Sequence, residues 1–123
     1  MKWSTMMPVG LRKYYKQQVH LALINKRRGN VAEWWYYLER AHVLAQPYPI
    51  EHTRVHWLML VFGIANKNGR EIIGQLPRLL VGGVKSFVGR VPVGNTGGAN
   101  VPGLQCMKIP ADLQAMIDEG LTD

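Results

Sequence analysis

Residues 27–60 read RRGNVAEWWYYLERAHVLAQPYPIEHTRVHWLML. Between the turn signal Gly29-Asn30 and the prolines Pro47 and Pro49, apolar residues recur at steps of three and four. The residues expected on one side of this segment are Trp34, Trp35, Leu38, Ala41, His42 and Ala45. This spacing predicts a helix over residues 31–45, because helical winding brings such positions onto one face and proline ends the helix.

The same periodicity continues on both sides of this segment. Further helices are predicted over residues 9–26, 51–66, 70–88 and 111–119. The turn signal Asn66-Lys67-Asn68-Gly69 separates the helices over residues 51–66 and 70–88. Pro77 and the pair Gly82-Gly83 disfavour the second of these helices. Residues 89–110 are rich in Gly, Pro, Asn and Val, which indicates an ordered loop or arm.

Short helices joined by tight turns predict helical hairpins. Small and apolar residues resemble the tetratricopeptide pattern at Leu21, Ala22, Gly29, Leu38 and Ala41, with Pro47 following. Trp34 departs from that pattern, and Gly29 and Gly69 are forty residues apart instead of the ~34 of a regular array. We therefore expect one all-α domain over residues 1–123. It has tetratricopeptide-like antiparallel helical hairpins (about four helices), a Gly/Pro-rich C-terminal arm and a short final helix.

Composition limits the function classes. The chain has 123 residues and a formal net charge of +7, with 47% apolar residues, which fits one packed core. Cys106 is the only cysteine, so the chain forms no intramolecular disulfide, and we expect a cytoplasmic protein. We read no signal peptide and no membrane span, since the longest apolar run, residues 57–65, is too short. Despite the positive charge we expect no nucleic-acid partner, because basic residues are not interleaved with stacking aromatics.

A Glu/His cluster carries the strongest functional signal. Glu39 and His42 are three residues apart on one predicted helix, and His52 and His56 are four apart on the next. Each pair shares a helix face, and a turn between Gln46 and Ile50 would set the pairs opposite each other. One carboxylate and three imidazoles are a plausible ligand set for Zn, Cu, Ni or Fe.

Structural roles remain open for the same residues. His42 can cap the end of its helix, Glu39 can pair with Arg40 or Arg54, and His56 can lie half-buried beside Trp57. His20 fits a core or surface position better than a ligand position.

Two other features carry weaker signals. The loop Gly94 to Gly98 can form a backbone nest for an anion, with Arg90, Asn95, Thr96, Gly97 and Gly98 as candidate binding residues. It lacks the Gly-Lys-Ser/Thr ending of a phosphate loop. Cys106 and Met107 offer soft ligands for Cu(I), although Met107 fits a packing role equally well.

Three blocks of the sequence resemble the signature blocks of a family of small uncharacterised bacterial proteins, a domain of unknown function. They are LERAHVLAQ at residues 38–46, HTRVHWLML at 52–60 and RVPVGNTGGANV at 90–101. The resemblance covers nearly the whole chain and implies that Glu39, the three histidines and the glycine loop are where the family's motifs fall. A loose association of such proteins with metal-resistance gene neighbourhoods favours a metal site.

Together these features predict a soluble transition-metal-binding protein, a sensor, buffer or delivery factor, with Glu39, His42, His52 and His56 as ligands. The alternative is a helical-repeat adaptor that binds a protein partner through an aromatic and basic face, without a metal. A metal-dependent enzyme ranks last, because the sequence has no evident general base or substrate pocket.

Overall fold

The computed structural model describes residues 6–87, 96–99 and 107–122. These residues form five helices and no strand: α1 (Val9–Arg28), α2 (Val31–Ala45), α3 (Pro49–Ala65), α4 (Gly69–Phe87) and α5 (Ala111–Thr122). The prediction of an all-α fold is confirmed. Most of the predicted arm, residues 89–95 and 100–106, lies outside the described residues, and so does Cys106.

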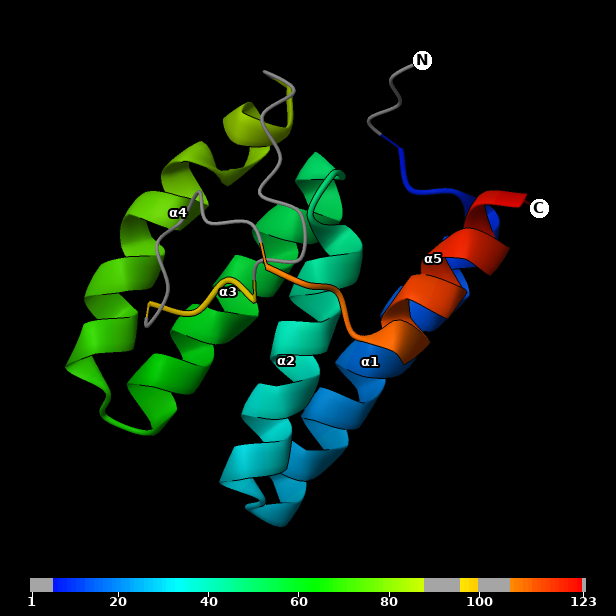
Figure 1. Ribbon diagram of the computed structural model, residues 1–123. Helices are drawn as coiled ribbons and strands as arrows, with labels where there is room; N and C mark the ends of the chain where they lie inside the picture. Colours follow the sequence, from blue (N-terminus) through cyan, green and yellow to red (C-terminus); the bar gives the residue numbers. More distant parts are fainter. Residues whose placement is uncertain (1–5, 88–95, 100–106, 123) are drawn as a thin grey trace.

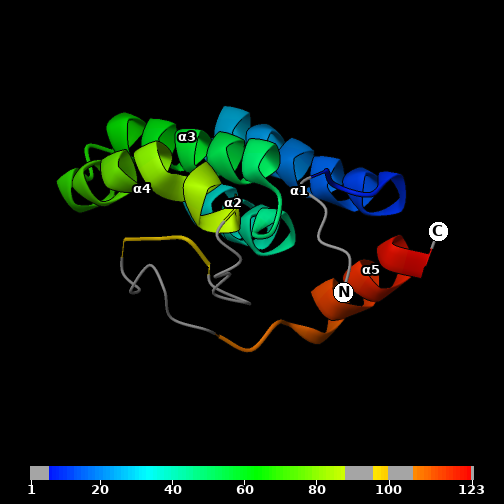
Figure 2. The same cartoon turned by 90° about the horizontal axis from the view of Figure 1, so that it is seen from above.

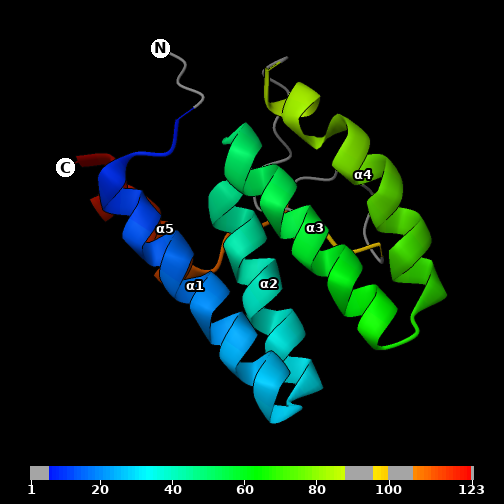
Figure 3. The same cartoon turned by 180° about the vertical axis from the view of Figure 1, so that it is seen from behind.

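Helices α1 to α4 lie side by side in chain order, each antiparallel to the one before it (Figures 1 and 3). Helix α5 returns to pack against α1, and Figure 2 shows residues 96–99 on the side of the four helices where α5 also lies. The two hairpins, α1–α2 and α3–α4, are compatible with the tetratricopeptide-like arrangement. No helix in the described ranges is both long and apolar enough to cross a membrane.

The turns between helices follow from their residues. Gly29 has a φ of 75°, a left-handed conformation that favours glycine at the end of a helix. Pro49 is the first residue of α3, where its missing N–H costs no helical hydrogen bond. Our predicted start at Glu51 was therefore two residues late, because we read Pro49 only as the end of the preceding helix. Helix α4 continues through Pro77.

The core lies among α1, α2 and α3 and extends to α5. Its most deeply buried apolar side chains, each at most 1% exposed, are Leu11, Ala22, Leu38, Ala41, Leu44, Ala45, Val55, Met59 and Leu113. At its edge, the buried Arg40 on α2 donates to Gln18 of α1 over 2.9 Å and pairs with Asp112 of α5. The hydrogen bond from Arg40 holds the pKa of the Asp112 carboxyl below its usual value. Arg40 thus ties three helices together.

Gly120 lets α5 approach α1 closely. A Cβ at this position would lie 2.7–2.8 Å from the N, Cα and Cβ atoms of Leu11. We expect Gly120→Ala to lower the free energy of unfolding by about 1–3 kcal/mol, because backbone atoms cannot move aside as a flexible side chain can. Urea unfolding measures this change.

Gly69→Ala is the matched control, since a Cβ there meets no atom within 4 Å. Alanine is also the better helix former by about 1 kcal/mol, so this variant should be neutral or stabilised. Equal stability of Gly120→Ala and wild type would contradict the close packing of α5 on α1.

Candidate metal centre

The short connection between α2 and α3 brings three histidines to one point. His42 lies in the last turn of α2, and His52 and His56 lie four residues apart near the start of α3. The connection is tight: the N–H of Tyr48 donates to the carbonyl of Ala45 over 2.8 Å, and that of His52 donates to Tyr48 over 2.8 Å. The end of one helix and the start of the next therefore lie close together, as the sequence predicted.

The three imidazole rings converge through their Nε2 atoms. Nε2 of His42 lies 3.1 Å from Nε2 of His52 and 3.1 Å from Nε2 of His56, and the third side of this triangle is 3.0 Å. The rings meet edge to face, with centroids 4.6–4.9 Å apart. The side chains are buried, with exposed fractions of only 1%, 2% and 3%. We call these residues the His triad.

No arrangement of protons satisfies all three contacts. Each Nε2 carries either a proton or a lone pair in the plane of its ring. With two possible states and three atoms, at least two atoms are in the same state. At least one contact then sets two N–H groups, or two lone pairs, against each other at hydrogen-bond distance. A cation removes this conflict, because all three nitrogens can direct lone pairs at it.

The size of the triangle suits a first-row transition metal. An ion at the Zn–N distance of about 2.0–2.1 Å from each nitrogen would lie about 1 Å out of their plane. The N–metal–N angles would then be about 95°, between octahedral and tetrahedral values. The His triad can therefore supply three ligands on one face of an ion without a large rearrangement.

Comparison with known protein families finds one match for this chain. The family model described as "Protein of unknown function (DUF3703)" matches residues 9–117. The chain belongs to the DUF3703 family. This confirms the predicted resemblance to a family of unknown function. No curated protein and no solved structure matches the chain.

In this DUF3703 protein, Glu39 lies outside the cluster. Among the described residues, His42, His52 and His56 form the group whose ligand atoms all lie within 4.8 Å of one another, and Glu39 is not part of it. Of the four predicted ligands, the structure brings the three histidines together and leaves Glu39 apart from them. The reason is helical geometry: Glu39 is nearly one turn before His42, so it lies farther from the α2–α3 connection that brings the histidines together.

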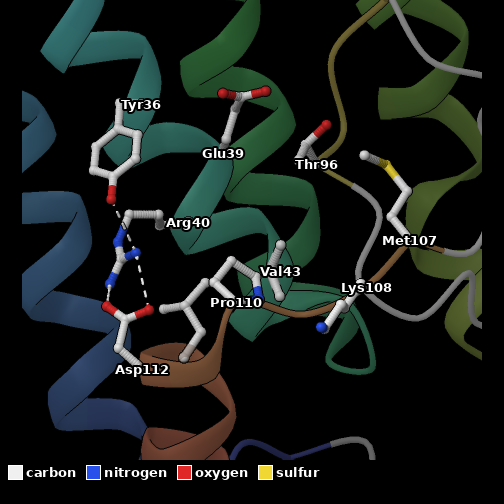
Figure 4. A pocket seen from close by; sticks show the side chains of 10 residues that line it. Tyr36, Glu39, Arg40, Val43, Thr96, Met107, Lys108, Pro110 and Asp112 are labelled. Atoms are coloured by element: carbon white, nitrogen blue, oxygen red, sulfur yellow. Dashed lines mark hydrogen bonds and ion pairs between the residues drawn. The ribbon is translucent and has the colours of Figure 1, made fainter.

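Glu39 instead faces a separate pocket of about 390 Å³, which Arg40, Thr96, Lys108 and Asp112 also line. In Figure 4 its side chain points away from the pair Arg40–Asp112 and toward the side of Thr96. Thr96 and Trp35 lower the pKa of the Glu39 carboxyl in part. The pKa of Glu39 is raised mainly by burial, and the charge of Glu71 raises it further.

The predicted anion loop is described only at residues 96–99, since Arg90 and Asn95 lie outside the described residues. The carbonyls of Gly97 and Gly98 accept hydrogen bonds from Arg78 over 2.7 and 2.5 Å. Gly97 has a φ of 85° and lies against His42, where an added Cβ would overlap the imidazole ring. The described part of the loop therefore contacts the protein itself and covers one side of the His triad.

Several residues around the His triad were not predicted from the sequence. Nδ1 of His56 lies 2.6 Å from Oε1 of Gln75, and Nε2 of Gln75 donates to Glu71 over 2.9 Å. Glu71 and Gln75 are four residues apart on α4, a spacing that exposed helix surfaces also use. A sequence pattern therefore cannot distinguish a buried pair with this spacing from an exposed one. Burial does so here, because Glu71 is 6% exposed and Gln75 is fully buried.

Proposed function

We propose that this protein binds a transition-metal ion through His42, His52 and His56 and acts as a cytoplasmic metal sensor, buffer or delivery factor. The observation that carries the proposal is the triangle of buried Nε2 atoms, 3.0–3.1 Å apart. A cation would satisfy contacts that no set of protons can. The loose link of the resembling family to metal resistance also favours this function, and a chain with one cysteine suits a reducing compartment.

The chemistry of the ligands limits the choice of ion. Three neutral imidazoles suit Zn(II), Ni(II), Cu(II), Co(II) and Fe(II) better than the hard ions Mg²⁺ and Ca²⁺, which prefer oxygen. The deep burial of the triad favours binding over catalysis, since each histidine is at most 3% exposed. A substrate would have to displace residues around the site before it reached the ion.

Metal binding should stabilise the fold. At a free metal concentration a hundredfold above the dissociation constant, we expect the free energy of unfolding to rise by about 2.7 kcal/mol. The melting temperature should then rise by roughly 10 °C for a domain of this size. Thermal unfolding of the protein without a His-tag, with Zn²⁺, Ni²⁺, Co²⁺ or Cu²⁺, measures this shift, and equilibrium dialysis should find one ion per chain.

Two variants make this experiment specific to the His triad. His20 is exposed on α1, outside the triad, so His20→Ala should retain the stoichiometry and the shift. The triple variant His42→Ala/His52→Ala/His56→Ala should lose both. Wild-type protein that melts at the same temperature with and without every one of these ions, and retains none after dialysis, would refute the proposal.

A helical-repeat adaptor is the second candidate function. Ile50, Trp57 and Ile64 are 77%, 55% and 58% exposed, and their spacing of seven residues sets them along one side of α3. This stripe is a better docking surface than the aromatic residues 34–37 of α2. Trp34 is buried there and Trp35 packs on Phe62 with ring centroids 4.7 Å apart.

The stripe can be tested apart from the metal. If the protein is an adaptor, Trp57→Gln should abolish capture of a partner while the triple histidine variant retains it. Loss of the partner in the triple histidine variant alone would contradict a metal-free adaptor.

A further inference from the structure

Helix α4 packs against α3 (Figure 3). It carries Gln75, whose fully buried amide lies beside the His triad. Oε1 of Gln75 lies 2.6 Å from Nδ1 of His56, the nitrogen that does not face the other two histidines. Only one side of this contact can supply the proton: either Nδ1 of His56, or the Gln75 amide if its NH₂ group faces the ring. Which one does depends on how the Gln75 amide is oriented.

The other contacts of Gln75 fix that orientation. Its second amide atom lies 2.9 Å from Oε2 of Glu71, 2.9 Å from the carbonyl oxygen of Gly97 and 3.6 Å from the sulfur of Met59. The carbonyl oxygen of Gly97 and the sulfur of Met59 have no hydrogen to donate, so they can only accept from this atom. The atom that faces them must therefore be the NH₂ group, and Oε1 faces His56. Nδ1 of His56 then carries the proton, so a neutral His56 directs the lone pair of Nε2 into the triad.

Glu71 is itself held in place from its far side. Its Oε1 atom accepts the backbone N–H of Ala99 over 2.8 Å, while Oε2 accepts the amide of Gln75. A buried carboxylate that accepts from the amide also polarises it, which strengthens Oε1 as an acceptor for the proton of His56. The hydrogen-bond chain thus runs from residue 99 through Glu71 and Gln75 to His56.

We propose that Gln75 and Glu71 are positioning residues of the metal site: they lock His56 in the tautomer that ligates through Nε2 and raise its affinity for the ion. This inference rests on the proposed function. Outer hydrogen-bond partners of ligating histidines have this effect in metal sites, where losing one weakens affinity by about 10- to 100-fold. Here the partner would be an amide backed by a carboxylate, in place of a carboxylate bonded directly to the imidazole.

Two variants separate positioning from simple packing. Gln75→Leu removes the acceptor for Nδ1 and should weaken zinc binding by about 10- to 100-fold. The double variant Glu71→Gln/Gln75→Glu exchanges the two groups. Gln at position 71 can accept from Ala99 and donate to Glu at position 75, whose carboxylate accepts the proton of His56. The second carboxylate oxygen at position 75 would then face the carbonyl oxygen of Gly97, to which the Gln75 amide donates over 2.9 Å in wild type. Zinc affinity in the double variant should therefore recover only part of the loss, and remain above that of Gln75→Leu.

The experiment has two readouts on folded protein, with folding checked by circular dichroism. Long-range ¹H–¹⁵N NMR of the metal-free protein reports the tautomer of His56, and competition with a zinc chelator reports the dissociation constant. Gln114→Leu is the matched control. Like Gln75, Gln114 donates to an acidic side chain four positions away, here Asp118 over 2.9 Å, but it does so on an exposed face. This control should change neither readout.

We expect an Nδ1-protonated His56 in wild type and in the double variant, and a mixed tautomer in Gln75→Leu. A double variant as weak for zinc as Gln75→Leu, or an Nε2-protonated His56 in metal-free wild type, would overturn the inference. Failure of wild type to bind zinc would instead count against the proposed function, since the tautomer measurement needs no metal.

Discussion

His52→Leu should weaken zinc binding by about a hundred- to a thousandfold. Structural zinc sites bind with about 10–16 kcal/mol from four ligands, so that one ligand accounts for about 3–4 kcal/mol. The remaining two imidazoles would still meet at 3.1 Å but could bind an ion only with water in place of His52. Isothermal titration of the untagged variant with zinc, beside His20→Ala, measures the loss.

Without metal, the effect of His52→Leu on the free energy of unfolding should be small. In wild type, at least one Nε2–Nε2 contact in the triad opposes two like groups, and an unsatisfied buried polar group costs about 1–3 kcal/mol. Leucine at position 52 removes that conflict and leaves one donor–acceptor pair. We expect the metal-free variant to lose less than about 2 kcal/mol, because relief of this conflict offsets the loss of the other contacts of His52. A metal-free variant that is less stable by about 2 kcal/mol or more would mean that the three contacts support the fold by themselves.

Gly97→Ala should reduce both stability and metal affinity. Position 97 has a φ of 85°, and an added Cβ would overlap the ring of His42. The left-handed conformation costs about 1–2 kcal/mol for a residue with a Cβ, and overpacking adds about 1–3 kcal/mol. Because His42 must move, zinc affinity should fall at least about tenfold, which corresponds to a loss of about 1.4 kcal/mol in binding free energy.

Gly29→Ala separates the two causes. Gly29 has a φ of 75° and no atom within 4 Å of an added Cβ. The Gly29→Ala substitution should lower the free energy of unfolding by about 1–2 kcal/mol through backbone conformation alone, and zinc affinity should stay that of wild type. Equal losses of stability in the two variants, together with equal zinc affinity, would contradict the close contact between Gly97 and His42.

Much of the fold follows from short-range signals in the sequence. Helix α2 was predicted at its observed bounds, Val31–Ala45, because Gly29-Asn30 and Pro47 mark its two ends. The start of α3 was missed because a proline can either end one helix or begin the next, and Pro49 begins α3. The final helix extends to Thr122, beyond the predicted Glu119. Gly120, directly after the predicted end, stays helical where α5 packs closely on α1, and a local sequence pattern does not contain that packing.

The candidate site was predictable where it depends on one tight turn. The four-residue spacing of His52 and His56, and the short connection that leads back to His42, are properties of neighbouring sequence. The amide of Gln75 and the backbone of Gly97 reach the triad through α4 and the loop after it. Their positions depend on tertiary packing, so no spacing in the sequence marks them. Glu39 lies apart from the converging histidines for the converse reason, since correct spacing on one helix does not fix its level relative to the next.

The most direct test of the account is a zinc titration of the untagged protein, followed through the imidazole resonances of its four histidines. We expect the resonances of His42, His52 and His56 to change together and to stop changing at one equivalent, each with the Nε2 shift of a metal-bound nitrogen, while His20 is unaffected. Resonances of these three residues that stay in place through several equivalents of zinc, or a change confined to His20, would contradict it.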